Sequence, residues 1–142
     1  MFEYIFLPTD TPVIIPPEMT QFKCLILIER DVSEDYRHEV SKTLVEASCL
    51  YTLAWGRNCT LWDDSVDWAF LEHYNHKNVP EEKFVTTTFH PNETLEEVIE
   101  FAKDCTEYSL VRLEDTLVLD FTQNERGDFI RELFLRDIAT TS

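Results

Sequence analysis

The segment from Phe22 to Glu29 limits the fold more than any other part of the sequence, because it is an almost unbroken apolar run. It reads FKCLILIE, a pattern typical of a β-strand that is buried on both faces. Such strands occur in parallel sheets that carry helices on both sides. The run therefore favours an α/β fold.

Three further strand-like segments alternate with helical segments along the chain. The later predicted strands are Leu50–Trp55, Phe84–Phe89 and Thr116–Phe121. The predicted helices run from Asp31 or Ser33 to Ser48, from Asp63 or Asp64 to Tyr74, from Thr94 to Cys105, and from Asp128 to Ala139. This alternation indicates βαβ units with right-handed crossovers. We therefore predict a single α/β domain over residues 1–142. It has three layers, about four mainly parallel strands flanked by helices, and a flavodoxin-like general shape.

Residues 1–21 form a different kind of segment, because they carry four of the six prolines of the chain. Proline has no amide donor, so it is excluded from helix interiors and from central strands. We therefore expect an extended or edge-like arm, packed on the domain through Phe2, Ile5, Phe6 and Ile14.

The net charge of −16 is the most informative compositional feature. Such a surface repels phosphate backbones, so no nucleic-acid partner is expected. The same charge attracts basic proteins and speeds their encounter, although it could also serve solubility alone. No apolar run approaches the roughly 18 residues of a membrane span. No basic residue precedes the apolar N-terminus, so a secretory signal is not expected and the predicted location is the cytoplasm.

The four cysteines are expected to be reduced, as is usual in the cytoplasm. Three lie among apolar neighbours in predicted elements and should be buried, namely Cys24, Cys49 and Cys105. No CxxC spacing occurs, so a thiolate zinc site is not predicted. Cys59 falls in a predicted loop from Gly56 to Thr60, where a nucleophilic pair with His90 is an alternative to a structural role.

In open parallel sheets, ligands bind beyond the carboxyl ends of the strands. The predicted strands bring four polar residues to that edge: Glu29, Asp31, His90 and Asp120. Carboxylates there suit a hard cation such as Mg²⁺, whereas the alternative is that they cap helices and face solvent. The chain has only two glycines, which is too few for a dinucleotide-binding turn or a P-loop. We therefore predict no cofactor and no resident metal.

Two acidic segments carry features of a protein interface. The first combines tryptophans with carboxylates, and its predicted contact residues are Trp62, Asp63, Asp64 and Asp67. Tryptophan supplies buried area in interfaces and acids select a basic partner, but Trp62 could equally anchor its helix to the core. The second places like charges on one side of a predicted helix, at Glu93, Glu97, Glu100 and Asp104. Such charges lower helix stability, although a solvated face is the simpler explanation.

Three functions fit these observations. The first is an acidic binding protein that neutralises or regulates a basic partner. In size and charge the chain is similar to small acidic bacterial immunity proteins, which block toxin nucleases and other effectors, but it shares no motif with them. The second is a ligand-binding or metal-assisted enzyme that uses the carboxyl edge, and the third is a subunit that self-associates through its Pro-rich arm. We favour the first, in which the protein is not an enzyme, and leave open its partner, its oligomeric state and whether it has any catalytic activity.

Overall fold

The protein is built on a parallel sheet. The computed structural model describes residues 1–75, 79, 83–104, 107–108 and 111–136. Its main sheet has five strands in the order β1-β7-β2-β3-β4, and every neighbouring pair is parallel. They are β1 (Phe2–Phe6), β2 (Phe22–Ile28), β3 (Cys49–Gly56), β4 (Thr86–His90) and β7 (Thr116–Phe121). Two short strands, β5 (Glu107–Tyr108) and β6 (Val111–Arg112), form a separate antiparallel pair.

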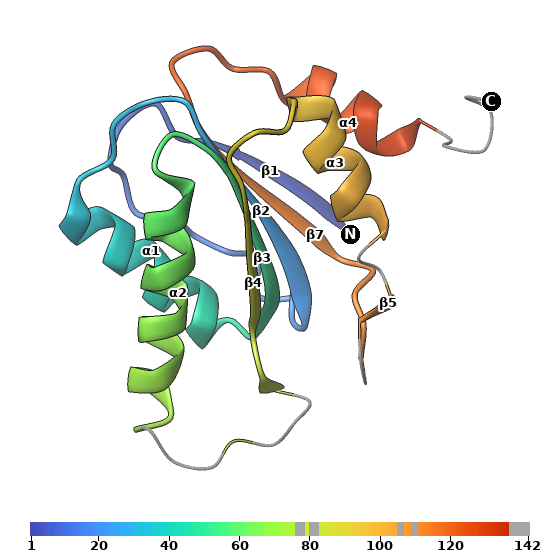
Figure 1. Ribbon diagram of the computed structural model, residues 1–142. Helices are drawn as coiled ribbons and strands as arrows, with labels where there is room; N and C mark the ends of the chain where they lie inside the picture. Colours follow the sequence, from blue (N-terminus) through green and yellow to red (C-terminus); the bar gives the residue numbers. More distant parts are fainter. Residues whose placement is uncertain (76–78, 80–82, 105–106, 109–110, 137–142) are drawn as a thin grey trace.

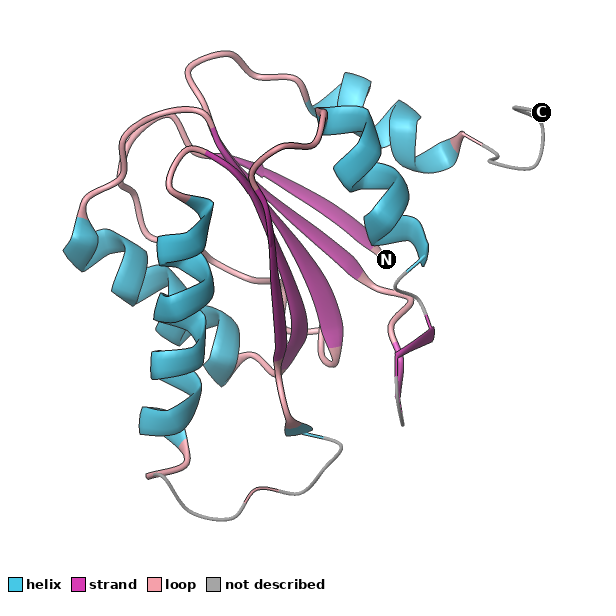
Figure 2. Cartoon of the chain, viewed as in Figure 1, coloured by secondary structure: helices cyan, strands magenta, loops and turns pink. Residues whose placement is uncertain are grey.

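Helices cover both faces of the main sheet. They are α1 (Glu34–Glu46), α2 (Cys59–His73), α3 (Leu95–Asp104) and α4 (Gly127–Leu135). The first two lie on one face and the last two on the other (Figures 1 and 2). This is the three-layer α/β arrangement, flavodoxin-like in general shape, that the alternation of strand and helix patterns predicted.

β2 is buried along its whole length because its side chains enter two different cores. Cys24, Ile26 and Ile28 join the core under α1 and α2, whereas Leu25 and Leu27 join the core under α3 and α4. Burying each large aliphatic side chain contributes roughly 1.5–3 kcal/mol. The apolar run at this position therefore reflects a central strand with a core on either side.

The N-terminal arm adds an edge strand and then crosses the core, in agreement with its proline content. β1 pairs with β7 at the end of the sheet. Beyond it, Leu7 and Met19 are buried, and Val13 and Ile15 pack against the same core. The prediction that Ile14 packs on the domain is wrong, because this side chain is exposed. Neighbouring side chains of an extended chain point in opposite directions, so Ile14 faces solvent when Val13 and Ile15 face the core.

The start of α2 also differs from the prediction. The helix begins at Cys59 rather than at Asp63 or Asp64, so Cys59 is not in a loop. Asn58 precedes it in the left-handed region with φ 56° and makes no side-chain capping bond. Asn is a favoured residue at a helix start, but the side chain of Asn58 does not make the capping hydrogen bond that usually accompanies it.

The described thiols are buried and free, as expected for Cys24 and Cys49. Burial raises the pKa of Cys24 well above its ordinary value and that of Cys49 to about 12, so both remain protonated. Cys105 and the predicted end of the last helix lie outside the described residues. Within the described part of the chain, no helix is long and apolar enough to cross a membrane.

Candidate protein-binding surface

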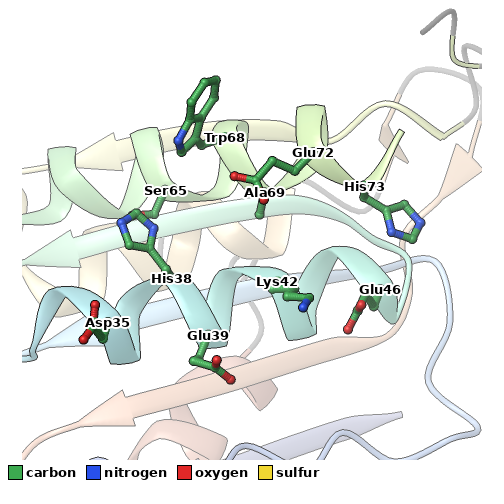
Figure 3. Close-up of a pocket in the computed structure, with 10 residues that line it drawn as sticks. All are labelled: Asp35, His38, Glu39, Lys42, Glu46, Ser65, Trp68, Ala69, Glu72 and His73. Carbon is green, nitrogen blue, oxygen red and sulfur yellow. The ribbon is translucent and has the colours of Figure 1, made fainter. Parts of the chain in front are cut away.

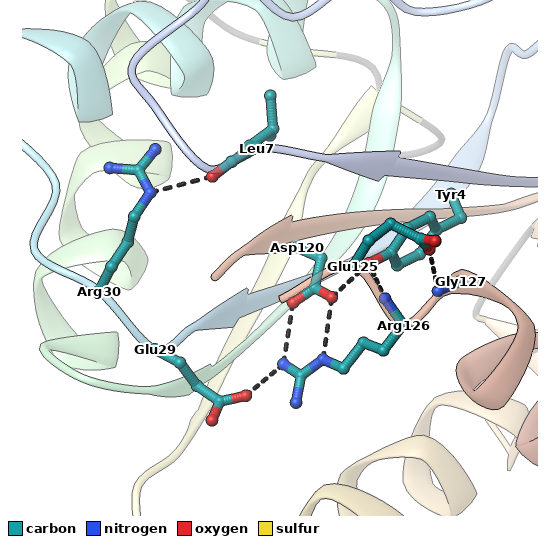
Figure 4. Close-up of polar contacts among 8 residues, drawn as sticks. All are labelled: Tyr4, Leu7, Glu29, Arg30, Asp120, Glu125, Arg126 and Gly127. Carbon is teal, nitrogen blue, oxygen red and sulfur yellow. Dashed lines mark hydrogen bonds and ion pairs between the residues drawn. The ribbon is translucent and has the colours of Figure 1, made fainter. Parts of the chain in front are cut away.

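The carboxyl edge of the sheet has a switch point between β2 and β7, because the chain leaves these neighbouring strands toward opposite faces. Such a point is the usual ligand site of an α/β sheet. Here the guanidinium of Arg126 occupies it (Figure 4). The Nε and Nη2 atoms of Arg126 donate to the two carboxylate oxygens of Asp120, each at 2.9 Å, and Nη2 also forms an ion pair with Glu29.

Asp120 is enclosed by these partners, with 0% of its side chain exposed. The hydroxyl of Tyr4 donates to Asp120 Oδ2 at 2.6 Å, and burial together with this hydrogen bond raises the pKa of Tyr4. Burial acts to lower the pKa of Arg126, but the hydrogen bonds to Asp120 outweigh it and the pKa is raised. Tyr4 therefore stays a neutral donor and Arg126 stays charged. The cluster is an internal ion-pair network in which both Glu29 and Asp120 already have a basic partner, Arg126.

The other two predicted edge residues have local partners. Asp31 accepts a hydrogen bond from Arg57 Nη1 at 3.0 Å. His90 is buried, with Nδ1 3.0 Å from Glu93 Oε1 and Nε2 2.9 Å from Thr88 Oγ1. The four residues therefore do not converge on one ligand. In the described ranges, no group of three or more His, Cys, Asp or Glu side chains is placed to hold a metal ion.

Cys59 and His90 are not brought together either. Cys59 is buried in the core under α1 and α2, beside Trp62. His90 packs edge-on against Phe101 of α3, on the opposite face, with the ring centroids 4.8 Å apart. The structure therefore provides no Cys59–His90 nucleophilic pair.

The two tryptophans of α2 lie on different sides of the helix. Trp62 is only 1% exposed and its ring centroid lies 5.1 Å from that of Phe121, so it anchors the helix to the core. It is in helical phase with the buried residues Val66 and Phe70. Trp68 falls outside that phase and is 54% exposed. The exposure of Trp68 could have been predicted from the sequence, because its spacing from Trp62, Val66 and Phe70 places it outside the buried stripe.

The outer side of α2 carries apolar and acidic side chains together. We call it the outer α2 stripe, and it consists of Leu61, Asp64, Asp67, Trp68 and Leu71, all of them exposed. Trp68 stands between two hollows of about 580 and about 350 Å³, and it lines both. The stripe thus combines an aromatic anchor with adjacent concave surface, a combination typical of protein interfaces.

The larger hollow is a groove between α1 and α2 (Figure 3). The helices are held together there by a hydrogen bond of 2.9 Å from Arg37 Nε to Ser65 Oγ. Acidic side chains outnumber lysine along the groove, since Asp35, Glu39, Glu46 and Glu72 line it with Lys42. The groove therefore extends the acidic character of the outer α2 stripe toward α1.

Three aspartates within two turns of α2 repel one another. Partial burial of the carboxylate and the charges of Asp63 and Asp64 raise the pKa of Asp67, although a hydrogen bond of 3.2 Å from Thr87 Oγ1 acts in the opposite direction. Among the described residues, no basic side chain forms an ion pair with any of the three aspartates. In the same part of the chain, Asp63 Oδ1 is buried without a hydrogen-bond partner. In the part of the chain that the structure describes, these charges therefore have no basic partner.

The second predicted acidic surface, on α3, is largely engaged inside the chain. Glu97 and Thr94 form a capping box, with bonds of 2.8 Å and 3.1 Å between each side chain and the other's backbone amide. Glu100 pairs with Lys103 at 3.3 Å, while Asp104 is exposed. Because α2 and α3 lie on opposite faces of the sheet, the two predicted acidic surfaces are separate. Only the one on α2 combines uncompensated acids with an exposed tryptophan.

A family model described as a domain of unknown function, DUF7684, matches residues 2–137. The chain belongs to the DUF7684 family. No curated protein and no solved structure matches it. The match runs from β1 to beyond α4, so the DUF7684 domain contains both the Arg126 ion pair and the outer α2 stripe.

Proposed function

We propose that this chain is a cytoplasmic binding protein that neutralises or regulates a basic protein partner, and that the partner docks on the outer α2 stripe. The observation that carries the proposal is Trp68, exposed beside the uncompensated carboxylates of Asp64 and Asp67. A tryptophan that becomes buried at an interface is among the commonest energetic anchors of protein complexes. Carboxylates around such an anchor select lysine and arginine and repel acidic competitors.

Solubility alone does not account for this surface. Carboxylates that serve solubility have no need of neighbouring apolar side chains, yet Leu61, Trp68 and Leu71 are all exposed on the same side of α2. Exposed apolar groups that gather beside polar ones indicate an interaction site. A second copy of the chain is a poor occupant, because each copy carries a net charge of −16 and would meet the same acidic stripe.

The carboxyl edge of the sheet does not favour the enzyme hypothesis. Its four residues are held by Arg126, Arg57 and the contacts of His90, and the switch-point crevice contains a protein side chain. A ligand at this edge would have to displace Arg126 from the buried carboxylate of Asp120, which carries a large energetic cost.

Site-specific photo-cross-linking in living cells tests the proposal. A photoreactive phenylalanine analogue is placed at Trp68, and in a matched variant at Phe129 of α4, which is 49% exposed on the other face. We expect the position-68 variant alone to cross-link a discrete basic protein. The affinity of that purified protein for the unmodified chain should fall steeply as salt is raised.

Two results would contradict the proposal. One is an equal yield of the same cross-linked protein from positions 68 and 129, which would indicate random collision. The other is a captured partner that is acidic, or one whose affinity does not change with salt concentration.

A further inference from the structure

The strand β4 lies at one edge of the main sheet. Within the described residues β4 has one neighbour, β3, whereas the adjacent strand β3 is paired on both sides. Figure 1 shows β4 at the end of the sheet with α2 on one side and α3 on the other. An edge strand presents peptide N–H and C=O groups that another extended chain can bind.

The side chains of β4 suit such an addition. Thr87 and Thr88 are β-branched and only partly buried, and Phe89 is 48% exposed. Residues of this kind stabilise a neighbouring strand through cross-strand contacts. Lysine, proline and β-bulges are the usual features that prevent another strand from pairing with an edge, and none of them occurs at these three residues.

Acidic groups lie on both sides of this edge. On the α2 side, Thr87 donates a hydrogen bond to Asp67, next to Asp63 and Asp64. On the α3 side, a hollow of about 470 Å³ is lined by five carboxylates and by Phe101, which packs against His90 of β4. Three of these carboxylates also have partners inside the chain, whereas those of Glu96 and Asp104 are exposed. Successive side chains of an added strand point to opposite faces of a sheet, so both would meet carboxylates.

We propose that β4 accepts an extended basic segment of the partner, which becomes an additional strand of the sheet. This inference rests on the proposed function and specifies how the partner binds. Basic side chains on one face of the segment lie near Asp67, and those on its other face enter the acidic hollow beside α3. The segment adjoins the outer α2 stripe, so one partner engages both. A second copy of this chain is a poor occupant, because its own β4 edge is flanked by acids and would be repelled by the acids here.

The first test uses a synthetic probe. It is a peptide of about eight residues in which two lysines alternate with two valines, so both faces of the added strand carry lysine, and it is long enough for a natural strand. The control has the same sequence with every backbone amide N-methylated, so it keeps its charge but has no N–H group for a strand ladder at either edge. We expect only the first peptide to slow amide hydrogen exchange at Thr88 or Phe89, by about tenfold or more at saturation.

The second test blocks the edge of the full chain. Adjacent residues of an edge strand direct their N–H groups alternately toward the neighbouring strand and outward, so Thr88→Pro and Phe89→Pro differ in effect. One of them should weaken the β3–β4 pairing and lower the melting temperature. The other should keep the native melting temperature and circular dichroism but bind the unmethylated peptide at least about tenfold more weakly.

The outcomes separate this inference from the proposed function. If both peptides bind equally and leave the β4 amides unprotected, strand addition is wrong, while a cross-link at position 68 still supports an acidic docking surface. If the folded proline variant binds as tightly as the unaltered chain, strand addition is again wrong. If neither peptide binds, the inference fails, and the cross-linking result alone decides the proposed function.

Discussion

The carboxylates at the carboxyl edge of the sheet and those on α2 differ in how the fold treats them. At the edge, Asp120 and Glu29 are both paired with Arg126, and Asp31 is paired with Arg57. On α2 the acids have no basic partner among the described residues, and the pKa of Asp67 is raised by burial and by its acidic neighbours.

This difference shows that the charge of the protein serves two purposes. An acid with a matched base stabilises the fold, since removing either member leaves a charge without compensation. An acid that raises its neighbour's pKa lowers the stability of the fold, so its presence calls for another explanation. The net charge of −16 therefore does not mark every acid as a contact for a partner.

The largest expected effect is at Arg126. Replacing it, as Arg126→Met, leaves the Asp120 carboxylate buried without its base, and we expect a loss of about 3–5 kcal/mol in the free energy of unfolding. Urea denaturation measures it. The matched variant Arg57→Met removes the base of the exposed Asp31 and should cost less than about 1 kcal/mol. Similar small losses in both variants would mean that the Arg126 ion pair does not close the crevice.

The next effect concerns binding rather than folding. Trp68→Ala should weaken binding of the cross-linked partner by about 2 kcal/mol or more, because it removes the central anchor of the stripe. This loss corresponds to a dissociation constant roughly 30-fold higher. The midpoint of unfolding should change little, since the side chain is largely exposed. Phe129→Ala removes an exposed aromatic from the opposite face and should leave the affinity within about twofold. Calorimetric titration of both variants decides whether the anchor lies on α2.

A smaller effect is expected on the rate of association. The double variant Asp64→Lys, Asp67→Lys should slow it by about tenfold at low salt. The control Asp128→Lys, Glu132→Lys on α4 shifts the charge equally, because each reversal adds two units and both variants go from −16 to −12. Stopped-flow measurements should show a much smaller change for the control. Equal slowing would mean that overall charge, and not the outer α2 stripe, guides the partner.

The sequence was informative wherever one segment contained the whole signal. The apolar run of β2 predicted a strand between two cores, and Thr94 with Glu97 predicted a capping box that the structure confirms. Pairing between distant segments could not be predicted in this way. β1 is a short strand followed by prolines, and its partner β7 lies at the far end of the chain. Local patterns predicted an extended arm there, and only the tertiary structure makes it a strand of the sheet.

The candidate site follows the same rule. Helical phase distinguishes the buried Trp62 from the exposed Trp68, so the anchor of the stripe could be located from spacing. No sequence pattern joins Arg126 to Glu29, because the contact depends on β7 and β2 being neighbours in the sheet. The edge acids therefore resembled a cation site until their base was located.

The smallest expected effect isolates the repulsion on α2. Asp67→Asn keeps an acceptor for Thr87 and removes a like charge at the i,i+4 and i,i+3 positions, so it should add about 0.2–0.5 kcal/mol of stability at pH 7. The folded pKa of Asp67 is raised above 3.8, so its charge destabilises the fold above that folded pKa. As the pH falls toward 3.8, Asp67 binds a proton more readily in the folded chain than in the unfolded chain. The difference in free energy of unfolding between the unaltered chain and Asp67→Asn should therefore disappear.

Asp10 provides the opposite control for that measurement. Its carboxylate pairs with Arg30 at 2.8 Å, and although burial acts to raise its pKa, the Arg30 contact lowers it overall. Asp10→Asn should therefore lower stability at pH 7, and this loss should vanish as the pH falls through the lowered folded pKa. The two variants thus shift the free energy of unfolding in opposite directions at neutral pH. In acid, both should have the same free energy of unfolding as the unaltered chain. If Asp67→Asn instead lowers stability at pH 7, the hydrogen bond from Thr87 outweighs the repulsion, and the acids of α2 help to hold the fold as those at the carboxyl edge do.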